Sequence, residues 1–249
     1  MTAAEPPALP VRRLLIWRHG RTEWNATGRF QGQLDPPLDA EGRVQAAHVA
    51  PLLAAQLPAG RTVVVSSDLS RARETAEALT SLLGVPLRTD ARLREHGLGC
   101  WEGLTRDEVA DRYPGQYADW TAGRPVRERG GEDPRDVVRR TRAALADLPP
   151  AEAAVVVTHG GTAGRLLEHL LELGPEHRRM LGALANAAWS DLVVQGTRWR
   201  LIRHNSFLPQ GADGHAGAPA ETATASEAEG TGTPEEGGPA PAQDADAVL

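Results

Sequence analysis

Three short apolar runs constrain the fold of this chain more than any other feature. They span residues 14–17, 62–65 and 154–157, consist mainly of aliphatic and β-branched residues, and each precedes a segment with helical periodicity. Strands that alternate with helices form a largely parallel sheet with helices on both faces. The sequence therefore predicts an α/β domain of three layers, αβα, with a mostly parallel central sheet.

The expected helices have recognisable starts and stops. Asp39 is the predicted N-cap of the first helix, and Thr105 and Glu108 have the spacing of a capping box. The first helix is expected to bury an apolar face of Val44, Ala47, Val49, Leu52 and Leu53. Further helices are predicted from 68 or 70 to 83, from 105, and over 114–120, 134–146, 161–173 and 176–181, with a terminal hairpin over 188–194 and 198–203.

Composition divides the chain into three parts. Residues 211–249 contain Ala, Gly, Pro, Ser, Thr and acids but no aromatic residue and no Arg, which predicts a disordered acidic tail. Residues 1–10 form an N-terminal extension, and residues 11–210 form one domain. Eight of the 33 acids lie in the tail, which leaves 25 acids against 27 basic residues in the rest of the chain. The net charge of −6 is therefore a property of the tail.

Several classes of protein are excluded or disfavoured. All 27 basic residues are Arg, so chemistry that requires Lys is excluded, and the single Cys100 excludes an internal disulfide or a Cys-rich metal site. No basic block suggests a nucleic-acid partner, and no apolar run has the length of a signal peptide or a membrane span. The expectation is a soluble, cytoplasmic protein that binds neither nucleic acid nor membrane.

Polar residues follow the three predicted strands at the edge where a parallel sheet binds ligands. Residues 18–20 are Arg-His-Gly, residues 66–68 are Ser-Ser-Asp, and residues 158–161 are Thr-His-Gly-Gly. A backbone carbonyl can hold one nitrogen of His19 in a fixed tautomer and leave the other free to accept a phosphoryl group. Arg18 and Arg71 supply guanidinium donors for phosphoryl oxygens.

Two further groups complete this chemistry. His159 repeats the strand-end His-Gly arrangement, and its imidazolium could donate to the same phosphoryl group. Glu95 lies in a Gly-rich loop suited to reach across a pocket, where its carboxyl could protonate an alkoxide leaving group and then activate water. Arg18 and Arg71 favour the ionised form of Glu95, whereas a bound phosphate dianion opposes it. We therefore expect Glu95 to act as an acid only in the substrate complex.

Five motifs in order resemble the histidine phosphatase (phosphoglycerate mutase-like) superfamily. They are Arg-His-Gly-x-Thr-x-x-Asn from residue 18, Gly-Gln-x-Asp-x-x-Leu from 32, Ser-Ser-Asp-Leu-x-Arg-Ala from 66, Leu-x-Glu-x-x-x-Gly-x-Trp-Glu-Gly from 93, and His-Gly-Gly from 159. The resemblance covers about residues 12–207. It implies the αβα fold and a phosphatase that forms a phosphohistidine.

The resemblance also implies a role for each matching residue. His19 is the expected nucleophile and Glu95 the proton donor, and His159 completes the catalytic set. The expected substrate contacts are Arg18, Asn25, Gln31, Gly32, Arg71 and Gly160. Guanidiniums replace the metal of other phosphoryl-transfer sites, so no metal and no cofactor are expected. Trp101 is expected to support Glu95 rather than to flank the pocket, Glu132 is expected to anchor a helix start or a loop, and His96 is a less favoured substrate contact.

The family contains both phosphatases and mutases. About thirty residues separate Leu104 from Pro134, whereas the mutases carry a longer, Lys-bearing insertion there, and this favours hydrolysis. In residues 32–35, 66–72, 186–189 (Asn-Ala-Ala-Trp) and 198–201, the chain is similar to bacterial glucosyl-3-phosphoglycerate phosphatases, which suggests a substrate among small phosphorylated sugars and glycerates. A phosphoglycerate mutase and a non-catalytic phospholigand-binding protein remain alternatives, and a homodimer is possible.

Overall fold

The computed structural model describes residues 9–174, 177 and 180–207. The predicted acidic tail, most of the N-terminal extension and half of the predicted helix 176–181 lie outside these residues. The described part contains a six-stranded sheet in the order β3-β2-β4-β1-β5-β6. The first four of these are mutually parallel, β5 is antiparallel to β1, and β6 is antiparallel to β5. The sheet is thus mostly parallel.

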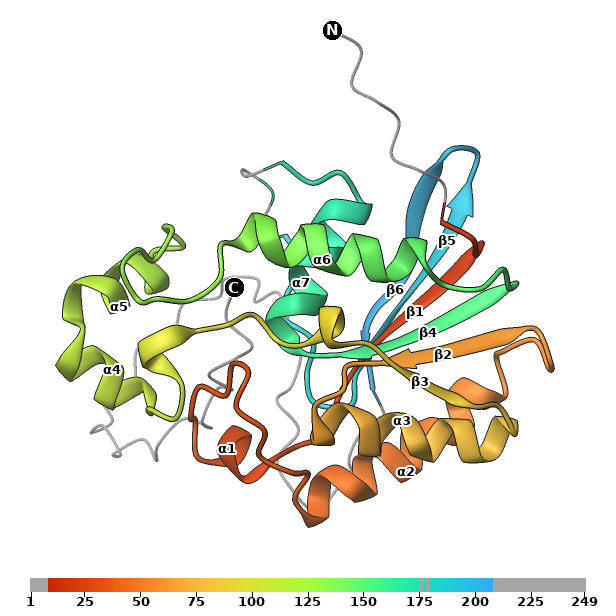
Figure 1. Cartoon of the computed structure of the whole chain (residues 1–249), viewed down its shortest axis with the longest axis horizontal. Helices are drawn as coiled ribbons and strands as arrows, with labels where there is room; N and C mark the ends of the chain where they lie inside the picture. The colour runs from red at the N-terminus through yellow and green to blue at the C-terminus, as the bar shows by residue number, and fades with distance from the viewer. Residues whose placement is uncertain (1–8, 175–176, 178–179, 208–249) are drawn as a thin grey trace, which may run out of the picture.

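Helices cover both faces of this sheet (Figure 1). The strands are β1 (Arg13–Arg18), β2 (Thr62–Ser66), β3 (Leu87–Thr89), β4 (Ala153–Thr158), β5 (Trp189–Gln195) and β6 (Arg198–Ser206). The helices are α1 (Glu23–Ala26), α2 (Ala40–Ala54), α3 (Ser70–Leu83), α4 (Arg106–Arg112), α5 (Pro114–Thr121), α6 (Pro134–Ala146) and α7 (Gly160–Leu170), with 3₁₀ turns η1 (Ala91–Leu93) and η2 (Gly99–Trp101). Helices α2 and α3 lie on one face and α6 and α7 on the other, which confirms the αβα prediction.

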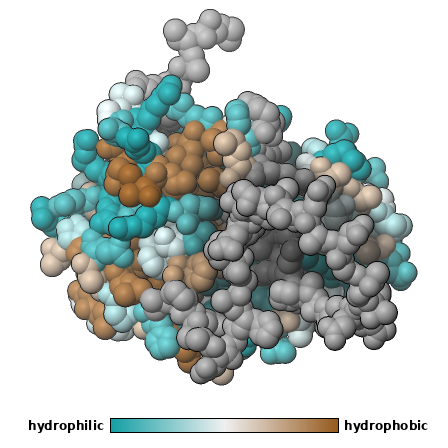
Figure 2. Space-filling view, turned by 180° about the vertical axis from the view of Figure 1, so that it is seen from behind, coloured by the Kyte–Doolittle hydropathy of each residue, from teal (hydrophilic) through white to brown (hydrophobic). Residues whose placement is uncertain are grey.

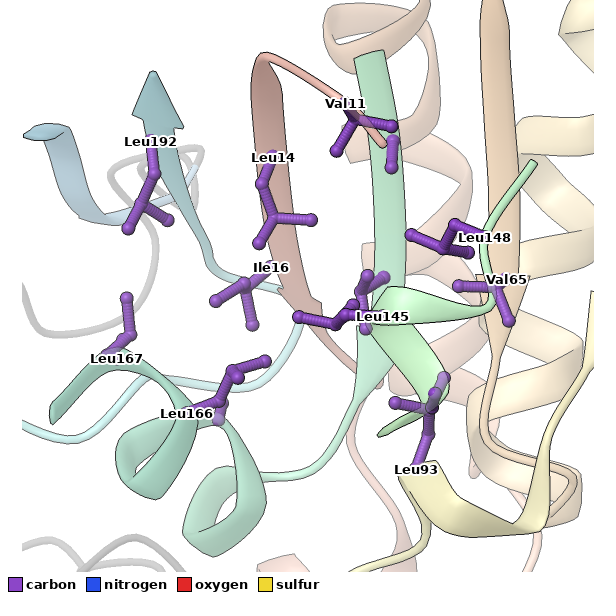
Figure 3. Packing of buried hydrophobic residues seen from close by; sticks show 14 of the residues in the cluster. Val11, Leu14, Ile16, Val65, Leu93, Leu145, Leu148, Leu166, Leu167 and Leu192 are labelled. Carbon is purple, nitrogen blue, oxygen red and sulfur yellow. The ribbon is translucent and has the colours of Figure 1, made fainter. Parts of the chain in front are cut away.

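Alternation along β1 explains why both faces need a cover. Leu14 and Ile16 point into a cluster with residues of α6 and α7, such as Leu145 and Leu166 (Figure 3). Leu15 and Trp17 point the other way, into a cluster with α2 and α3. Successive side chains of a strand point to opposite faces, so a strand that is apolar throughout must be buried on both. All six residues of β4 are buried for the same reason.

The predicted start of α2 is confirmed, but its predicted buried face is partly wrong. Asp39 is the N-cap, and its carboxylate accepts from the backbone N–H of Gly42. Val44, Ala47 and Leu52 are exposed, and the buried stripe is instead Gly42, Ala46, Val49, Ala50 and Leu53. This helix carries Ala or another apolar residue on nearly every side, so periodicity alone does not identify the side that packs against α3.

The other predicted elements agree closely with the structure. Helix α3 ends at Gly84 in the left-handed conformation, α4 begins with the Thr105–Glu108 capping box, and β5 and β6 form the terminal hairpin. Helix α7 begins one residue before its predicted start and ends at Leu170 rather than at 173. The sequence patterns did not predict α1 and β3, which are too short for periodicity to reveal.

A small lobe of α4 and α5 flanks the end of the sheet where the candidate site lies (Figure 1). Its core is aromatic: Phe30 and Trp101 are fully buried, and Trp120 packs against both rings. The indole N–H of Trp101 donates to Gln116 at 2.8 Å. Trp101 therefore anchors the loop after Glu95 to this lobe, as predicted.

The surface differs from the core in its mixture of residue types. Seen from behind, it carries a patch of hydrophobic residues set among hydrophilic ones (Figure 2). Within the described ranges, every helix is too short or too polar to cross a membrane.

Candidate active site

The ends of three adjacent strands bring two histidines and a serine together. His19 follows β1, Ser67 follows β2 and His159 follows β4, and β4 lies between the other two strands in the sheet. The rings of His19 and His159 lie edge to face with their centroids 5.1 Å apart. His159 Nε2 lies 2.9 Å from Ser67 Oγ. The side chains that follow these strands therefore lie together at the sheet edge that the sequence predicted.

His19 has the tautomer that a nucleophile requires. Its Nδ1 lies 2.7 Å from the carbonyl oxygen of Gly20. Because a carbonyl can only accept, Nδ1 carries the proton and Nε2 carries the lone pair. Burial lowers the pKa of His19 well below its ordinary value of 6.5, and the positive charges of Arg71 and Arg18 lower it further. The imidazole is therefore neutral at physiological pH.

His159 is held differently from His19. Its Nε2 pairs with Ser67, whereas its buried Nδ1 has no hydrogen-bond partner within the described part of the chain. Burial is the largest cause that lowers its pKa well below the ordinary value, followed by the charges of Arg71, His19 and Arg18. The expected imidazolium is therefore disfavoured in the protein alone. An anion placed between the arginines would oppose their field and favour the protonated ring.

Two buried guanidiniums flank these rings. Arg18 ends β1, and its Nη1 donates to the carbonyl of Leu184 at 2.7 Å. Arg71 lies in the first turn of α3, and its two Nη atoms donate to the carbonyls of Leu34 and Gly32 at 2.7 and 2.9 Å. Each Nη has a second hydrogen, so these contacts orient the guanidinium without using all its donors. Arg71 thus ties the loop around Gly32 to the histidines.

The loop that contains Gly32 leaves no room for a side chain at position 32. Gly32 has a φ of +50°, and a Cβ there would lie 2.2 Å from Glu102 Oε1. That same carboxylate oxygen accepts from the backbone N–H of Gln33 at 3.2 Å and of Leu98 at 2.9 Å. Glu102 therefore joins the Gly32 loop to the loop that follows Glu95.

The short helix α1 carries Asn25, which Asn186 links to the backbone of His19. Asn25 Oδ1 accepts from the backbone N–H of Thr22 at 3.0 Å and from Nδ2 of Asn186 at 3.2 Å. The Nδ2 of Asn186 also lies 3.3 Å from the carbonyl oxygen of His19. Gln31 is fully buried, with Oε1 3.0 Å from the hydroxyl of Thr22. These bonds identify the oxygen end of Asn25, so its NH₂ is the end suited to an anion.

The side chain of Glu95 lies against the N-terminus of α7, the helix that directly follows His159. Its carboxylate accepts from the backbone N–H of Gly161 at 3.0 Å and of Thr162 at 2.8 Å, and the Thr162 hydroxyl lies 3.0 Å away. The backbone N–H of His96 adds another bond at 2.7 Å. Gly160, the first residue of α7, is buried between His159 and these donors. The carboxylate and both histidines therefore share one edge of the sheet, as predicted.

Several residues that hold the site received no role from the sequence. Ser67 was placed at this edge only as part of a strand end, and Thr162 and Arg140 were not considered. Asn186 lies in an Asn-Ala-Ala-Trp stretch that resembled relatives but suggested no contact. Their partners are distant along the chain, and among these residues only Thr162 directly follows a motif that the sequence had singled out, His-Gly-Gly at 159–161. Glu132 has the predicted anchoring role: its carboxylate accepts from the backbone N–H of Gly97 at 2.8 Å.

The charges in this pocket suit an anion rather than a cation. Among the residues that the structure describes, no group of three or more His, Cys, Asp or Glu side chains is arranged to hold a metal ion. The groups that face His19 are guanidiniums, an amide and a second imidazole, all of which can donate to phosphoryl oxygens.

Comparison with known proteins decides the family. The sequence profile of the histidine phosphatase superfamily (branch 1) matches residues 14–206. The chain belongs to the histidine phosphatase superfamily. It is 37% identical over 222 residues to a glucosyl-3-phosphoglycerate phosphatase of Mycobacterium tuberculosis, which covers 82% of this chain and 98% of that protein. It is 36% identical to a Yersinia enterocolitica protein named "Probable phosphoglycerate mutase GpmB", over 75% of this chain and 87% of that protein.

Solved structures agree with the sequence comparison. The structure of a mycobacterial glucosyl-3-phosphoglycerate phosphatase with VO3 superposes with a TM-score of 0.70 at 38% identity, covering 79% of this chain and 100% of that one. An alpha-ribazole phosphatase from Shigella flexneri gives a TM-score of 0.68 at 25% identity, covering 78% and 96%. The predicted superfamily, its αβα fold and an enzyme of the histidine phosphatase type are confirmed.

Proposed function

We propose that this member of the superfamily hydrolyses a small phosphorylated metabolite, glucosyl-3-phosphoglycerate, without a metal and through a phosphohistidine at His19. One observation carries the mechanism. The proton of His19 is held on Nδ1 by the carbonyl of Gly20, in a ring kept neutral by burial and by Arg71 and Arg18. The lone pair of Nε2 is therefore available at neutral pH, in a pocket whose charges attract a phosphate.

The proposed reaction has two steps. Nε2 of His19 attacks phosphorus, the P–O bond to the leaving alcohol breaks, and the carboxyl of Glu95 gives its proton to the departing oxygen. Water then attacks the phosphohistidine, the P–N bond breaks, and the carboxylate of Glu95 takes a proton from that water. Arg18, Arg71, the amide of Asn25 and Nδ1 of His159 donate to the phosphoryl oxygens in both steps.

The state of Glu95 depends on the substrate. Three backbone N–H groups and the Thr162 hydroxyl surround its carboxylate, and all of these can donate to an ionised acid. A phosphate dianion beside it favours uptake of a proton, because like charges then repel. We therefore place the protonation of Glu95 in the substrate complex. An acidic limb of the pH–rate profile that is identical for free enzyme and complex would contradict this order of events.

The substrate class rests on the relatives. Proteins named glucosyl-3-phosphoglycerate phosphatase are 37–40% identical to this chain, and the GpmB proteins are 35–36% identical. The short segment between Leu104 and Pro134 supports water rather than a second substrate hydroxyl as the acceptor. A phosphoglycerate mutase is the second candidate, because the GpmB proteins also match three quarters of this chain.

A single panel assay tests the proposal. Phosphorylated three-carbon acids, sugar phosphates and glucosyl-3-phosphoglycerate are incubated with the enzyme, with and without a chelator. We expect phosphate release that the chelator does not change, fastest with glucosyl-3-phosphoglycerate, and acid-labile label on the protein after a rapid quench. An isomerised product without phosphate release would indicate a mutase, and binding without turnover would indicate a phospholigand-binding protein. A cytoplasmic location and a homodimer remain predictions.

A further inference from the structure

Arg140 of α6 holds the backbone that carries Glu95. Its Nη1 donates to the carbonyls of Arg92 and Arg94, each at 2.7 Å, and its Nη2 donates to the carbonyl of Glu95 at 2.9 Å. The remaining donors bind the carboxylate of Glu132, from Nε at 2.9 Å and from Nη2 at 2.9 Å. The Arg140 side chain is 16% exposed. One guanidinium thus contacts three of the four carbonyls between residues 92 and 95.

Glu132 extends these contacts to the residue after His96, and we call Arg140 and Glu132 together the clamp. Its Oε2 accepts from the backbone N–H of Gly97 at 2.8 Å and from Nε2 of Gln33 at 3.1 Å. The same Nε2 of Gln33 donates to the carbonyl of Glu95 at 3.2 Å. Arg140 and Glu132 therefore hold the main chain before and after Glu95 and connect it to the Gly32 loop.

The clamp and the helical groups that donate hydrogen bonds to the Glu95 carboxylate lie on different elements. The carboxylate is bound by the N-terminus of α7, whereas its main chain is bound from α6. The carbonyl of Arg94 shows the convergence, since it accepts from both Arg140 and the Thr162 hydroxyl. A proton donor must be held within a fraction of an ångström of its target, so both ends of the residue need support.

We infer that Arg140, paired with Glu132, is a positioning residue for proton donation by Glu95. The inference rests on the proposed role of Glu95. Lys cannot replace the guanidinium, because one ammonium cannot reach three carbonyls and a carboxylate in the planar pattern that Arg140 makes. Loss of Arg140 should therefore act on the leaving group rather than on phosphate binding.

The test compares two substrates that differ in their need for an acid. The leaving group of glycerol 3-phosphate is an alkoxide that must be protonated, whereas the p-nitrophenolate released from p-nitrophenyl phosphate is stable without a proton. For Arg140→Met we expect kcat/KM to fall on the order of 10- to 100-fold with glycerol 3-phosphate and less than about threefold with p-nitrophenyl phosphate. Arg140→Lys should show the same selective loss, and Glu95→Gln sets the reference pattern.

Three controls separate positioning from general damage. Arg139→Met removes an arginine from the same helix, whose side chain is 77% exposed and pairs with Asp136, and should leave both substrates unaffected. Competitive inhibition by inorganic phosphate should change little in Arg140→Met, because the hydrogen bonds of Arg140 go to the main chain before and at Glu95 and to Glu132, not to His19, Arg18 or Arg71. The double variant Glu95→Gln/Arg140→Met should lose little beyond Glu95→Gln alone.

The possible failures are distinct. If Glu95→Gln discriminates between the two substrates but Arg140→Met lowers both equally or neither, the positioning role is wrong and the proposed function stands. If Glu95→Gln itself does not discriminate, Glu95 is not the acid, and both the proposed mechanism and this inference fail.

Discussion

The two chemical groups of the site are held in contrasting ways. His19 is oriented largely by its own neighbourhood, because Nδ1 bonds the carbonyl of the next residue and its backbone N–H continues the pairing with β4. Glu95 is oriented mainly from afar: besides the backbone N–H of His96, its carboxylate accepts from residues 161 and 162, and its carbonyl accepts from Arg140 and Gln33. A nucleophile can thus be encoded in a few consecutive residues, whereas the proton donor depends on the packing of α6 and α7.

The difference implies different responses to mutation. Changes near His19 should affect every substrate, since all of them form the same phosphohistidine. Changes around Glu95 should lower kcat/KM only for substrates whose leaving group needs a proton, because kcat/KM does not include the later hydrolysis of the phosphohistidine. Each experiment below tests that division.

The largest effect is expected from His19→Ala. Removal of the nucleophile should lower kcat by about 10⁴-fold or more with every substrate, because the remaining groups bind phosphate but cannot form the intermediate. Steady-state assays on p-nitrophenyl phosphate and glucosyl-3-phosphoglycerate measure this, and the acid-labile label should disappear. A variant that hydrolyses as fast as the parent would remove His19 from the mechanism.

Arg71→Lys should have the next largest effect. The carbonyls of Leu34 and Gly32 orient the guanidinium of Arg71, and a lysine cannot make the same planar pair of hydrogen bonds. We expect kcat/KM to fall on the order of 10²-fold, equally for both leaving groups, with weaker inhibition by inorganic phosphate. Arg73→Lys, an exposed change on the same helix, is the matched control. A loss of kcat/KM confined to alkyl phosphates would contradict the distinction between residues around His19 and residues around Glu95.

Acid should destabilise the fold through the two histidines. Their folded pKa values lie well below 6.5, so as pH falls below 6.5 the unfolded chain binds protons that the folded chain does not. The free energy of unfolding should not depend on these groups above pH 6.5 and should decrease below it by up to about 1.4 kcal/mol per pH unit for each histidine. Urea titrations at several pH values measure this. His159→Asn should reduce the slope, and the exposed change His48→Asn should not.

The smallest effect is expected from Thr162→Val, which removes one hydroxyl beside Glu95. We expect about a fivefold loss of kcat/KM with glycerol 3-phosphate and almost none with p-nitrophenyl phosphate, because one hydrogen bond contributes about 1 kcal/mol. Ser67→Ala removes a hydroxyl beside His159 and should give a similar loss with both substrates. If Thr162→Val and Ser67→Ala lower kcat/KM for the two substrates in the same proportion, the groups around Glu95 and those around His159 do not act on different parts of the reaction.

The sequence was sufficient for the local features. Three apolar runs of four residues predicted the parallel strands β1, β2 and β4, and the capping residues Asp39 and Thr105 predicted where helices begin. The strand-end motifs located His19, His159 and Arg71, because parallel strands present their carboxyl ends at one edge. The pairing of the His19 ring with a backbone carbonyl also followed from the order His-Gly.

Only the tertiary structure decided how these parts cooperate. The buried side of α2 depended on which of several apolar sides met α3, and the sequence predicted Val44, Ala47 and Leu52 incorrectly. The depressed pKa of His159 required its burial between two guanidiniums. The clamp of Arg140 joins residues 45 to 48 positions apart. Periodicity and motifs describe neighbours along the chain, whereas burial, fields and long-range hydrogen bonds exist only once distant segments pack together.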